Sequence, residues 1–293
     1  MSSGKLFELS LSRRGTDPAR KIRDMAQATD FFLEAGFAYE ALAASEWKTM
    51  YRLAAYTPSA KLAERTARSA AHLRGWSFVK KTLVPEDWMD AWKKRYRISP
   101  LGRRFAVVPV WERKKDTGMR IPIVIDPQGA FGSGLHETTR LAVRMMEPLA
   151  GSFESFLDLG TGTGILCAAA RHLGAREISG TDIDPGSVKT ARLNLRINGI
   201  RGARILKDDL YRPALRGRFD LVAANMISKT LEETRKQILK FVPSGGLLLV
   251  TGISLANLPG FLKNFAGPPL RRLRILRGRS WGAVLYRRQN SEV

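Results

Sequence analysis

The stretch that decides the fold is Phe156–Gly164, which reads Phe-Leu-Asp-Leu-Gly-Thr-Gly-Thr-Gly. An apolar run ends in an acidic residue, and three glycines then alternate with threonines. Residues 165–172 follow with the composition of a helix, so the pattern predicts a strand, a tight turn and a helix start. Glycines let a ligand lie against the backbone, and a helix start offers free N–H groups. The stretch therefore predicts a ligand-binding turn.

A second acidic motif follows at the distance of one more strand. Residues 176–181 form that predicted strand, and Asp182-Ile183-Asp184 comes directly after it. The dinucleotide pattern G-x-G-x-x-G does not fit, because the third glycine, Gly164, comes one residue early. The spacing resembles the D-x-G-x-G-x-G turn of class I S-adenosylmethionine-dependent methyltransferases, in which the carboxylate after the second strand accepts the ribose hydroxyls. A chance glycine-rich turn is the alternative.

Composition excludes several classes of protein. The 293 residues suffice for two domains, and 44% hydrophobic with 26% charged residues is ordinary for a globular chain. The apolar runs are far shorter than the ~20 residues of a membrane span, and no secretory signal is present, which predicts a cytoplasmic protein without a membrane partner. The single cysteine, Cys167, is expected to be a buried small hydrophobe. No Cys or His pair has metal-ligand spacing, so no metal is expected.

The formal net charge of +22 is spread over both halves of the chain. Such a surface attracts polyanions, and the attraction should weaken steeply with salt. A generally basic surface without a particular partner is the alternative.

The first 85 residues are expected to form a small domain of their own. Strands are predicted at 5–12, 39–45, 48–56 and 76–84, with helices at 18–34 and 60–73. This β-α-β-β-α-β order is that of a ferredoxin-like α+β domain. No catalytic constellation occurs in it, so we expect a substrate-recognition or oligomerisation domain.

A connector is predicted at residues 86–115. It begins with a short helix whose Trp88 and Trp92 lie on one face and are expected to pack on a neighbouring domain. Basic residues interleaved with aromatics follow, which indicate either a nucleic-acid contact or, more simply, a solvated face. A strand is expected at 105–110.

Residues 116–293 are expected to form a parallel, doubly wound Rossmann-like methyltransferase domain. Helices are predicted at 185–197 and 230–241, strands at 203–206, 219–224 and 247–251, and a closing β-hairpin at 271–275 and 283–287. The motifs stand at the carboxyl ends of strands, where ligands bind in such sheets. Asp208 or Asp209 is expected to meet the adenine amino group, with a turn-capping acid as the alternative.

The loop at residues 126–139 is the second informative segment. It is rich in glycine and ends in Thr138-Thr139 before an apolar helix. Thr139 is expected to bind the amino-acid end of the cofactor, and Phe131 to cover the adenine or the sulfonium, which a ring face attracts as a cation. A plain interdomain loop is the alternative.

Four motifs together resemble one family. Residues 131–139, 158–164 and 182–185 and Asn225-Met226-Ile227 stand in the order and spacing of the ribosomal protein L-eleven methyltransferases (PrmA-like). The family's cofactor contacts fall on Thr139, Gly160, Asp182 and Asn225. Leu135 and Met226 depart from its usual Thr and Ile, which bears on the substrate more than on the cofactor. The resemblance implies methylation of lysine side chains and of an N-terminal amine, with a ferredoxin-like domain docking the substrate.

The sequence therefore predicts a protein N-methyltransferase that uses S-adenosylmethionine. Its partner would be a basic ribosomal protein, free or within an assembly intermediate, and contact with rRNA is left open. The rivals are an rRNA methyltransferase, a lysine methyltransferase with a non-ribosomal substrate, and a non-catalytic ribosome-binding module. Asn225 is the expected catalytic residue, and the expected cofactor residues are Thr139, Phe131, Asp158, Gly160, Gly162, Gly164, Asp182, Ile183, Asp208, Asp209 and Asn225.

Overall fold

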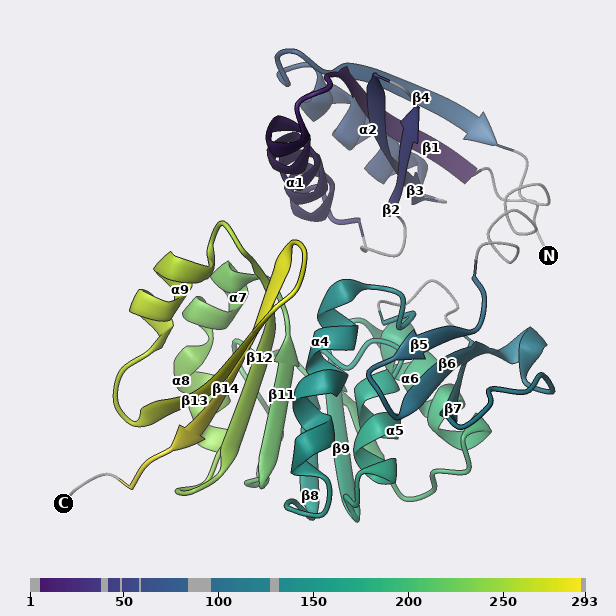
Figure 1. The fold of residues 1–293 in the computed structure, drawn as a ribbon. Helices are drawn as coiled ribbons and strands as arrows, with labels where there is room; N and C mark the ends of the chain where they lie inside the picture. The colour runs from purple at the N-terminus through teal and green to yellow at the C-terminus, as the bar shows by residue number, and fades with distance from the viewer. Residues whose placement is uncertain are drawn as a thin grey trace. The chain divides into compact units, whose positions relative to one another are not determined.

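The computed structural model describes residues 6–37, 42–47, 49–57, 59–83, 96–126 and 132–290. The chain divides into two compact units, Met1–Arg97 and Ile98–Val293 (Figure 1). The residues that the sequence analysis placed in the connector at 98–115 thus lie in the second unit. Trp88 and Trp92 fall outside the described residues. No described helix has the length and apolar character that crossing a membrane requires.

The first unit is one antiparallel sheet with two helices. Its elements are β1 (Leu6–Arg14), α1 (Pro18–Glu34), β2 (Leu42–Trp47), β3 (Met50–Thr57), α2 (Ala60–Ala70) and β4 (Ser77–Leu83). The strand order is β2-β3-β1-β4, so the first strand lies between the third and the fourth. Asp17 accepts a hydrogen bond from the backbone N–H of Ala19 and caps α1, with Pro18 in the first turn, as the sequence indicates. Phe32 of α1 and Ala63 of α2 share one core with Leu9, so both helices cover the same face.

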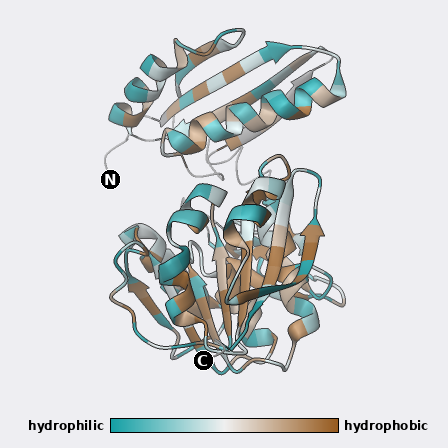
Figure 2. Cartoon of the chain, turned by 90° about the vertical axis from the view of Figure 1, so that its left-hand side faces the viewer, coloured by the Kyte–Doolittle hydropathy of each residue, from teal (hydrophilic) through white to brown (hydrophobic). Residues whose placement is uncertain are grey.

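The second unit contains a seven-stranded mixed sheet. Its strands are β8 (Ser155–Leu159), β9 (Glu177–Asp182), β10 (Arg204–Lys207), β11 (Leu221–Asn225), β12 (Leu247–Ser254), β13 (Leu270–Arg277) and β14 (Trp281–Arg288). The order is β10-β9-β8-β11-β12-β14-β13, with the first five parallel. The last two form the antiparallel hairpin expected from the sequence, so the sheet as a whole is mixed rather than parallel. Its strands are mostly apolar (Figure 2).

Helices cover both faces of this sheet. They are α4 (Glu137–Met146), α5 (Ile165–His172), α6 (Pro185–Ile197), α7 (Ser228–Glu233), α8 (Arg235–Phe241) and α9 (Leu258–Phe265). The last three pack on the strand residues that include Val222 and Leu248, whereas α4, α5 and α6 contact one another on the opposite face. The layered arrangement brings the carboxyl ends of the parallel strands, where the predicted site residues stand, to one edge.

A small three-stranded sheet precedes the main one. It consists of β5 (Ser99–Leu101), β6 (Phe105–Pro109) and β7 (Ile121–Ile125), and all five residues of β6 are buried. The strand predicted at 105–110 is therefore present. The next strand, β7, pairs with it in parallel and contacts α5 and α6, and it precedes the loop that leads to α4.

The helix predicted at residues 230–241 is divided into two helices in the structure. Residues 230–241 were expected to form a single helix, but α7 begins at Ser228 and ends at Glu233, and α8 begins at Arg235. Thr234 between them is fully buried, and its hydroxyl donates to the carbonyl oxygen of Thr230 at 2.6 Å. Such back-bonding bends helices, and here it accompanies a break.

Candidate active site

The glycine turn after β8 has the conformation that its sequence requires. Gly160, Gly162 and Gly164 have φ of +70°, +53° and +80°, in the left-handed region that side chains other than glycine rarely adopt. Gly164 is also the N-cap of α5, and a Cβ atom there would lie 3.2 Å from the Cα atom of Ala191 in α6. Close packing between the turn and α6 therefore excludes larger residues at Gly164.

Asp158, the last acid of β8, is buried beside this turn. Its Oδ2 atom accepts a hydrogen bond of 2.8 Å from the hydroxyl of Thr161 and a longer contact from the Sγ atom of Cys167. Its Oδ1 atom is buried and has no partner among the described residues. Burial raises the pKa of Asp158 to about 7; the Thr161 hydroxyl opposes this, and the charge of Asp182 adds to it. The buried position expected for Cys167 is confirmed.

Asp182 ends β9 and bridges two segments of the site. Its carboxylate accepts hydrogen bonds from the N–H of Gly162 at 2.9 Å and from the N–H of Asp184 at 3.0 Å. Partial burial raises the pKa of Asp182. Asp184 has a different task, because it caps α6 by accepting from the N–H of Ser187 at 2.8 Å. Ile183 between them is 64% exposed, so its apolar side chain is available to a flat apolar ligand.

The loop before α4 lies against the glycine turn. The hydroxyl of Thr163 donates to the carbonyl oxygen of Gly132 at 2.6 Å, and Gly132 has a φ of +102°. Asn194 of α6 joins the start of this loop to the glycine turn. Its Nδ2 atom donates to the carbonyl oxygens of Asp126 and Thr163, and its Oδ1 atom accepts from the N–H of Asp126. Sequence reasoning did not identify Asn194, because a polar residue in a helix carries no local signal of such a bond. Phe131 lies outside the described residues.

Thr139 is 1% exposed, and its hydroxyl has no hydrogen-bond partner among the described residues. Buried hydroxyls are normally bonded, so such a group points to a missing ligand. Together with the unused Oδ1 atom of Asp158, the site offers one free hydroxyl and one free carboxylate oxygen. These groups fit the carboxylate and the ammonium of an amino acid, and Asp182 fits a ribose. The residues therefore fit S-adenosylmethionine.

The start of α4 is tied to the far end of the chain. Glu137 accepts hydrogen bonds from the backbone N–H groups of Arg279 and Ser280, in the turn between β13 and β14. The Nδ1 atom of His136 lies 2.6 Å from the hydroxyl of Thr138. Burial, with a smaller effect of Arg140, lowers the pKa of His136 to about 3, so this ring is neutral at pH 7. His136 and Glu137 thus hold the loop, a role that the sequence did not reveal.

Asn225 is the last residue of β11, and Met226 follows it at the same edge of the sheet. The N–H of Met226 donates to the carbonyl oxygen of Thr251 at 3.0 Å. A Cβ atom on Gly252 would lie only 2.3 Å from the carbonyl oxygen of Met226, and one on Gly160 would lie 2.8 Å from its Cε atom. The side chain of Met226 therefore lies against Gly160, and Asn225 comes next after Ala224, which pairs with Leu159 of β8.

Asp208 and Asp209 follow β10 and hold the loop after it. Asp208 accepts from the backbone N–H groups of Ala214 and Leu215 at 2.8 and 2.9 Å, and Asp209 accepts from that of Tyr211 at 2.9 Å. These bonds are those of turn-capping acids, the alternative role considered for them above. Among the described residues, no three His, Cys, Asp or Glu side chains form a group that could hold a metal ion.

The described site residues thus gather from four strand ends and one loop. Asp182 and Asn225 end β9 and β11, and Gly160 and Asp208 follow β8 and β10. The hydrogen bond from Thr163 to Gly132 brings the loop that leads to Thr139 against the glycine turn. Gly252 is a further positioning residue that sequence reasoning missed, although a glycine inside an apolar strand is a signal of close backbone approach.

Comparison with known proteins gives a consistent result. The family model described as ribosomal protein L11 methyltransferase (PrmA) matches residues 19–259. A ribosomal protein L11 methyltransferase of Pelobacter propionicus is 35% identical over 212 residues, which are 71% of this chain and 68% of that relative. One of Caldanaerobacter subterraneus subsp. tengcongensis is 38% identical over 168 residues, 57% of this chain and 54% of that relative.

A solved structure also matches the chain. The ribosomal protein L11 methylase of Lactobacillus delbrueckii subsp. bulgaricus aligns with a TM-score of 0.62 and 31% sequence identity. The alignment covers 67% of this chain and 100% of that one.

Proposed function

Since the chain belongs to the ribosomal protein L11 methyltransferase family, we propose that it transfers methyl groups from S-adenosylmethionine to amino groups of ribosomal protein L11. The chain is an S-adenosylmethionine-dependent protein methyltransferase with the class I fold. The observation that carries the proposal is the strand end Asn225-Met226, which lies against the first glycine of the ligand-binding turn. A location in the cytoplasm belongs to the same proposal.

The residues of the glycine turn and its neighbours would hold the cofactor. The hydroxyl of Thr139 would donate to the carboxylate of the amino-acid end, and the Oδ1 atom of Asp158 would accept from its ammonium group; neither atom has another partner among the described residues. The backbone of Gly160, Gly162 and Gly164 would pass along the ligand.

The nucleoside end would lie one strand over. Asp182 would bind the ribose hydroxyls, and the exposed side chain of Ile183 would lie against the adenine. Asp208 or Asp209 would meet the adenine amino group in addition to holding its loop. The place of Phe131 over the adenine or sulfonium remains part of the same prediction.

Orientation is the main catalytic task of the protein. When bound, S-adenosylmethionine supplies an electrophilic methyl group on a good leaving group. Alignment of a nucleophile with such a centre can contribute about 7 kcal/mol or more in well-oriented reactions. The amide oxygen of Asn225 would accept a hydrogen bond from the substrate amine and direct its lone pair toward the methyl carbon. The hydrogen bond from the N–H of Met226 to the carbonyl oxygen of Thr251 would keep this strand end in place.

A lysine amine must also lose its proton before it can react. With a reference pKa near 10.4, the neutral form costs about 4.6 kcal/mol at pH 7. Burying the amine at the edge of the sheet and placing it near a cation both favour the neutral form. Water can take the proton, so this mechanism requires no general base.

We propose further that the first unit is a ferredoxin-like domain that docks the protein substrate, with a connector near residues 86–97 between it and the methyltransferase domain. The element order β-α-β-β-α-β and the strand order β2-β3-β1-β4 support this. Both are features of the ferredoxin-like arrangement, although the docking role itself rests on family membership.

Methylation of rRNA is the second candidate, because the net charge of +22 favours a polyanionic partner. Enzymes that modify planar base amines need an aromatic ring beside the reactive amine, where it stacks on the base. Met226 and Ile227 supply no ring at this position. The aliphatic strand end therefore favours a lysine or an N-terminal amine over a base.

The test is tritiated methyl transfer by the full chain to purified ribosomal protein L11 and, separately, to protein-free rRNA. We expect label in the protein and none in the RNA, and we expect the Asp182→Ala variant to lose the activity. Label in the RNA alone would overturn the proposal. Mass spectrometry of L11 from a deletion strain gives an independent reading, since its methyl groups should disappear.

A further inference from the structure

One segment of the chain is basic without any compensating acid. Between Asp184 and Asp208 the sequence contains no aspartate or glutamate, but it contains the six cations Lys189, Arg192, Arg196, Arg201, Arg204 and Lys207. The segment forms α6, the following turn and β10, which is an edge strand of the seven-stranded sheet. All six of these residues are exposed. Residues 234–291 also lack acids, but their 11 cations are spread over 58 residues, whereas these six lie within 19 residues.

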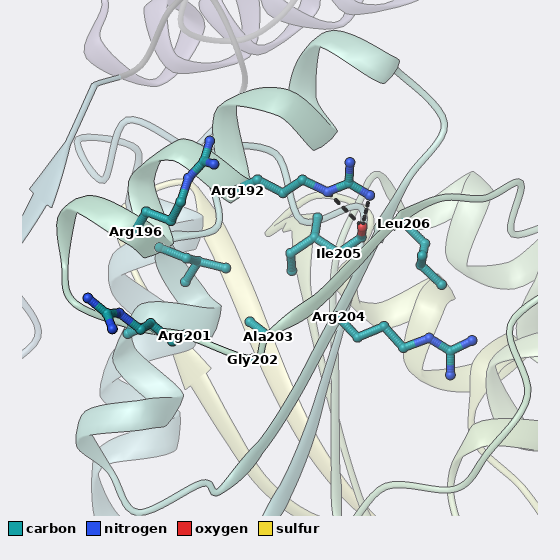
Figure 3. A pocket seen from close by; sticks show the side chains of 10 residues that line it. Arg192, Arg196, Arg201, Gly202, Ala203, Arg204, Ile205 and Leu206 are labelled. Atoms are coloured by element: carbon teal, nitrogen blue, oxygen red, sulfur yellow. Dashed lines mark hydrogen bonds between the residues drawn. The ribbon is translucent and has the colours of Figure 1, made fainter.

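A hollow of about 480 Å³ lies between the end of α6 and β10. Its apolar floor includes Leu195, Ile200 and Ile205, and the small residues Gly202 and Ala203 leave it open. Figure 3 shows the four arginines that surround it, which are Arg192, Arg196, Arg201 and Arg204.

Arg192 is fixed in this arrangement. Its Nε and Nη2 atoms lie 3.1 and 2.5 Å from the carbonyl oxygen of Ile205, to which both donate (Figure 3). This pair of bonds satisfies a carbonyl on the edge strand and orders one guanidinium group at the rim. Arg192 therefore has a structural task, whereas Arg196, Arg201 and Arg204 have none that the described contacts show.

A second hollow continues the first along α6. It is lined by Lys189 and Lys207 and shares Arg192 and Arg196 with the first. Lys189, Arg192 and Arg196 lie on α6, and the other three cations lie on the following turn and on β10. Together the two hollows border α6 from Pro185 to Arg196, nearly its whole length of 13 residues or about 20 Å. Within the described part of the chain, none of the six forms an ion pair, although Lys207 lies near enough to Asp184 to lower the pKa of that carboxyl group.

A simpler explanation accounts for only part of this surface. Cations protect an edge strand from pairing with another chain, and β13 at the opposite edge also carries arginines. That explanation covers Arg204 and Lys207 but not the cations of α6. Another basic hollow is lined by Arg103, Arg104, Arg144 and Arg274. The carboxylate of Glu147 also lines that hollow and offsets the charge of these arginines. The groove along α6 and β10 has no such acid in its lining.

We propose that this groove between α6 and β10 binds the phosphate backbone of RNA. Guanidinium groups bind phosphates through two parallel hydrogen bonds, and arginines outnumber lysines four to two in the groove. Six cations around two adjoining hollows match an extended anion rather than a single one. The choice of RNA over DNA rests on the proposed function, because the substrate of that reaction assembles on RNA. The inference that the groove binds phosphates does not depend on the proposed function.

Bound RNA would reduce the electrostatic repulsion between the enzyme and a basic protein substrate. A chain of net charge +22 repels a basic ribosomal protein, so encounter between the two free proteins is disfavoured. RNA bound in the groove would neutralise part of this charge and bring the enzyme to the place where its substrate assembles. The groove would thus act in recruitment and take no part in methyl transfer.

The experiment measures binding of a fluorescent RNA stem-loop of about 20 base pairs to the full chain, without cofactor or protein substrate, at about 50 to 300 mM salt. The test variant carries Arg196→Gln, Arg201→Gln and Arg204→Gln, and leaves Arg192 in place. The matched control carries Arg271→Gln, Arg274→Gln and Arg277→Gln on β13, with the same change in charge.

We expect the groove variant to weaken RNA binding about tenfold or more and to lower the slope of log affinity against log salt by about 2 to 3. The control should retain most of the affinity, and both variants should methylate free protein substrate at the wild-type rate. Equal losses in the two variants would show that net charge alone binds RNA and would overturn the proposal. Tighter binding of a DNA duplex, of polyglutamate or of anionic vesicles than of RNA would overturn it as well. Because no methyl transfer is needed for binding, failure of the proposed function would be seen separately.

Discussion

The carboxylate of Asp182 accepts a hydrogen bond of 2.9 Å from the backbone N–H of Gly162, which joins the end of β9 to the glycine turn after β8. The same carboxylate also accepts from the N–H of Asp184. One side chain therefore sets the spacing between two segments that would hold the nucleoside.

Replacing Asp182 by alanine should weaken cofactor binding about 10- to 100-fold, because hydrogen bonds to a charged group contribute about 1.5–3 kcal/mol. Isothermal calorimetry measures the affinity. Asp220→Ala is the matched control, since Asp220 also accepts two backbone N–H bonds, from Glu154 and Ser155, at the other ends of the strands. It should lower the free energy of unfolding without changing cofactor affinity. Similar affinities in the two variants would contradict a ribose contact.

Cofactor affinity should depend on pH through Asp158, whose pKa is raised to about 7 by burial. Only the carboxylate form can accept from the cofactor's ammonium group, and this form is lost as the pH falls through 7. We therefore expect affinity to fall up to about tenfold per unit as the pH is lowered below 7. Asp158→Asn should abolish this dependence, and calorimetry in two buffers should detect proton release on binding in the wild type.

Asp184→Asn is the control for the pH experiment. Burial favours the neutral form of Asp184, but hydrogen bonds from Ser187 and Gly186 prevail and lower its pKa, so it stays charged over this range. Its replacement should leave the pH dependence intact. A pH-independent affinity in the wild type would refute the role assigned to Asp158.

Thr139→Val should separate ligand binding from stability. The hydroxyl of Thr139 is buried and unpaired among the described residues, so removing it should leave the free energy of unfolding unchanged or raise it by about 1 kcal/mol. Cofactor affinity should fall about tenfold, because a hydrogen bond to the cofactor's carboxylate is lost. The control, Thr163→Val, removes a hydroxyl bonded to Gly132 at 2.6 Å and should lose about 1–2 kcal/mol of stability in urea. A loss of stability in Thr139→Val would mean that its hydroxyl already has a partner.

Asn225→Ala should lower turnover about 100-fold while changing cofactor affinity less than about fivefold, since Asn225 is expected to orient the amine. Steady-state kinetics with protein substrate and calorimetry with cofactor supply the two numbers. Asn225→Asp keeps an acceptor oxygen and should retain more activity than the alanine variant. Comparable losses of turnover and affinity would assign Asn225 to cofactor binding instead.

Gly252→Ala should disturb the active site from the neighbouring strand. Gly252 has a φ of +90°, and a Cβ atom would lie 2.3 Å from the carbonyl oxygen of Met226, so the backbone beside Asn225 must move. We expect reduced turnover together with a loss of stability greater than that of Gly245→Ala. Gly245 has a φ of +78° but open space around it, and its replacement should cost only the strain of about 1–2 kcal/mol. Equal effects in both variants would exclude the proposed contact.

The elements around the glycine turn were predictable because their signals are local. Gly160, Gly162 and Gly164 need left-handed backbone, and glycine is the residue that adopts it at no steric cost. The helices at 165–172 and 185–197 begin and end in the structure where the sequence places them, and their starts are marked by the N-cap residues Gly164 and Asp184. The acids and the asparagine at the strand ends follow from the strand pattern itself.

Other parts of the site could not be read from the sequence, because they depend on residues far apart in the chain. Glu137 bonds to the N–H of Ser280, 143 positions away, and Asn194 bonds to Asp126, 68 positions away. Both are ordinary surface residue types in a helix, and nothing local distinguishes them. The break at Thr234 was also missed, because a single threonine in a helical pattern is common and its burial is set by packing.

The hydrogen bonds from Arg279 and Ser280 to Glu137 can form only late in the synthesis of the chain. The helix that begins beside Thr139 is made early, but its anchor emerges from the ribosome only after about 140 further residues, at about 5–20 residues per second. We therefore expect the nascent enzyme to reach its full affinity for the methyl donor only when the closing hairpin has been translated and has joined the sheet.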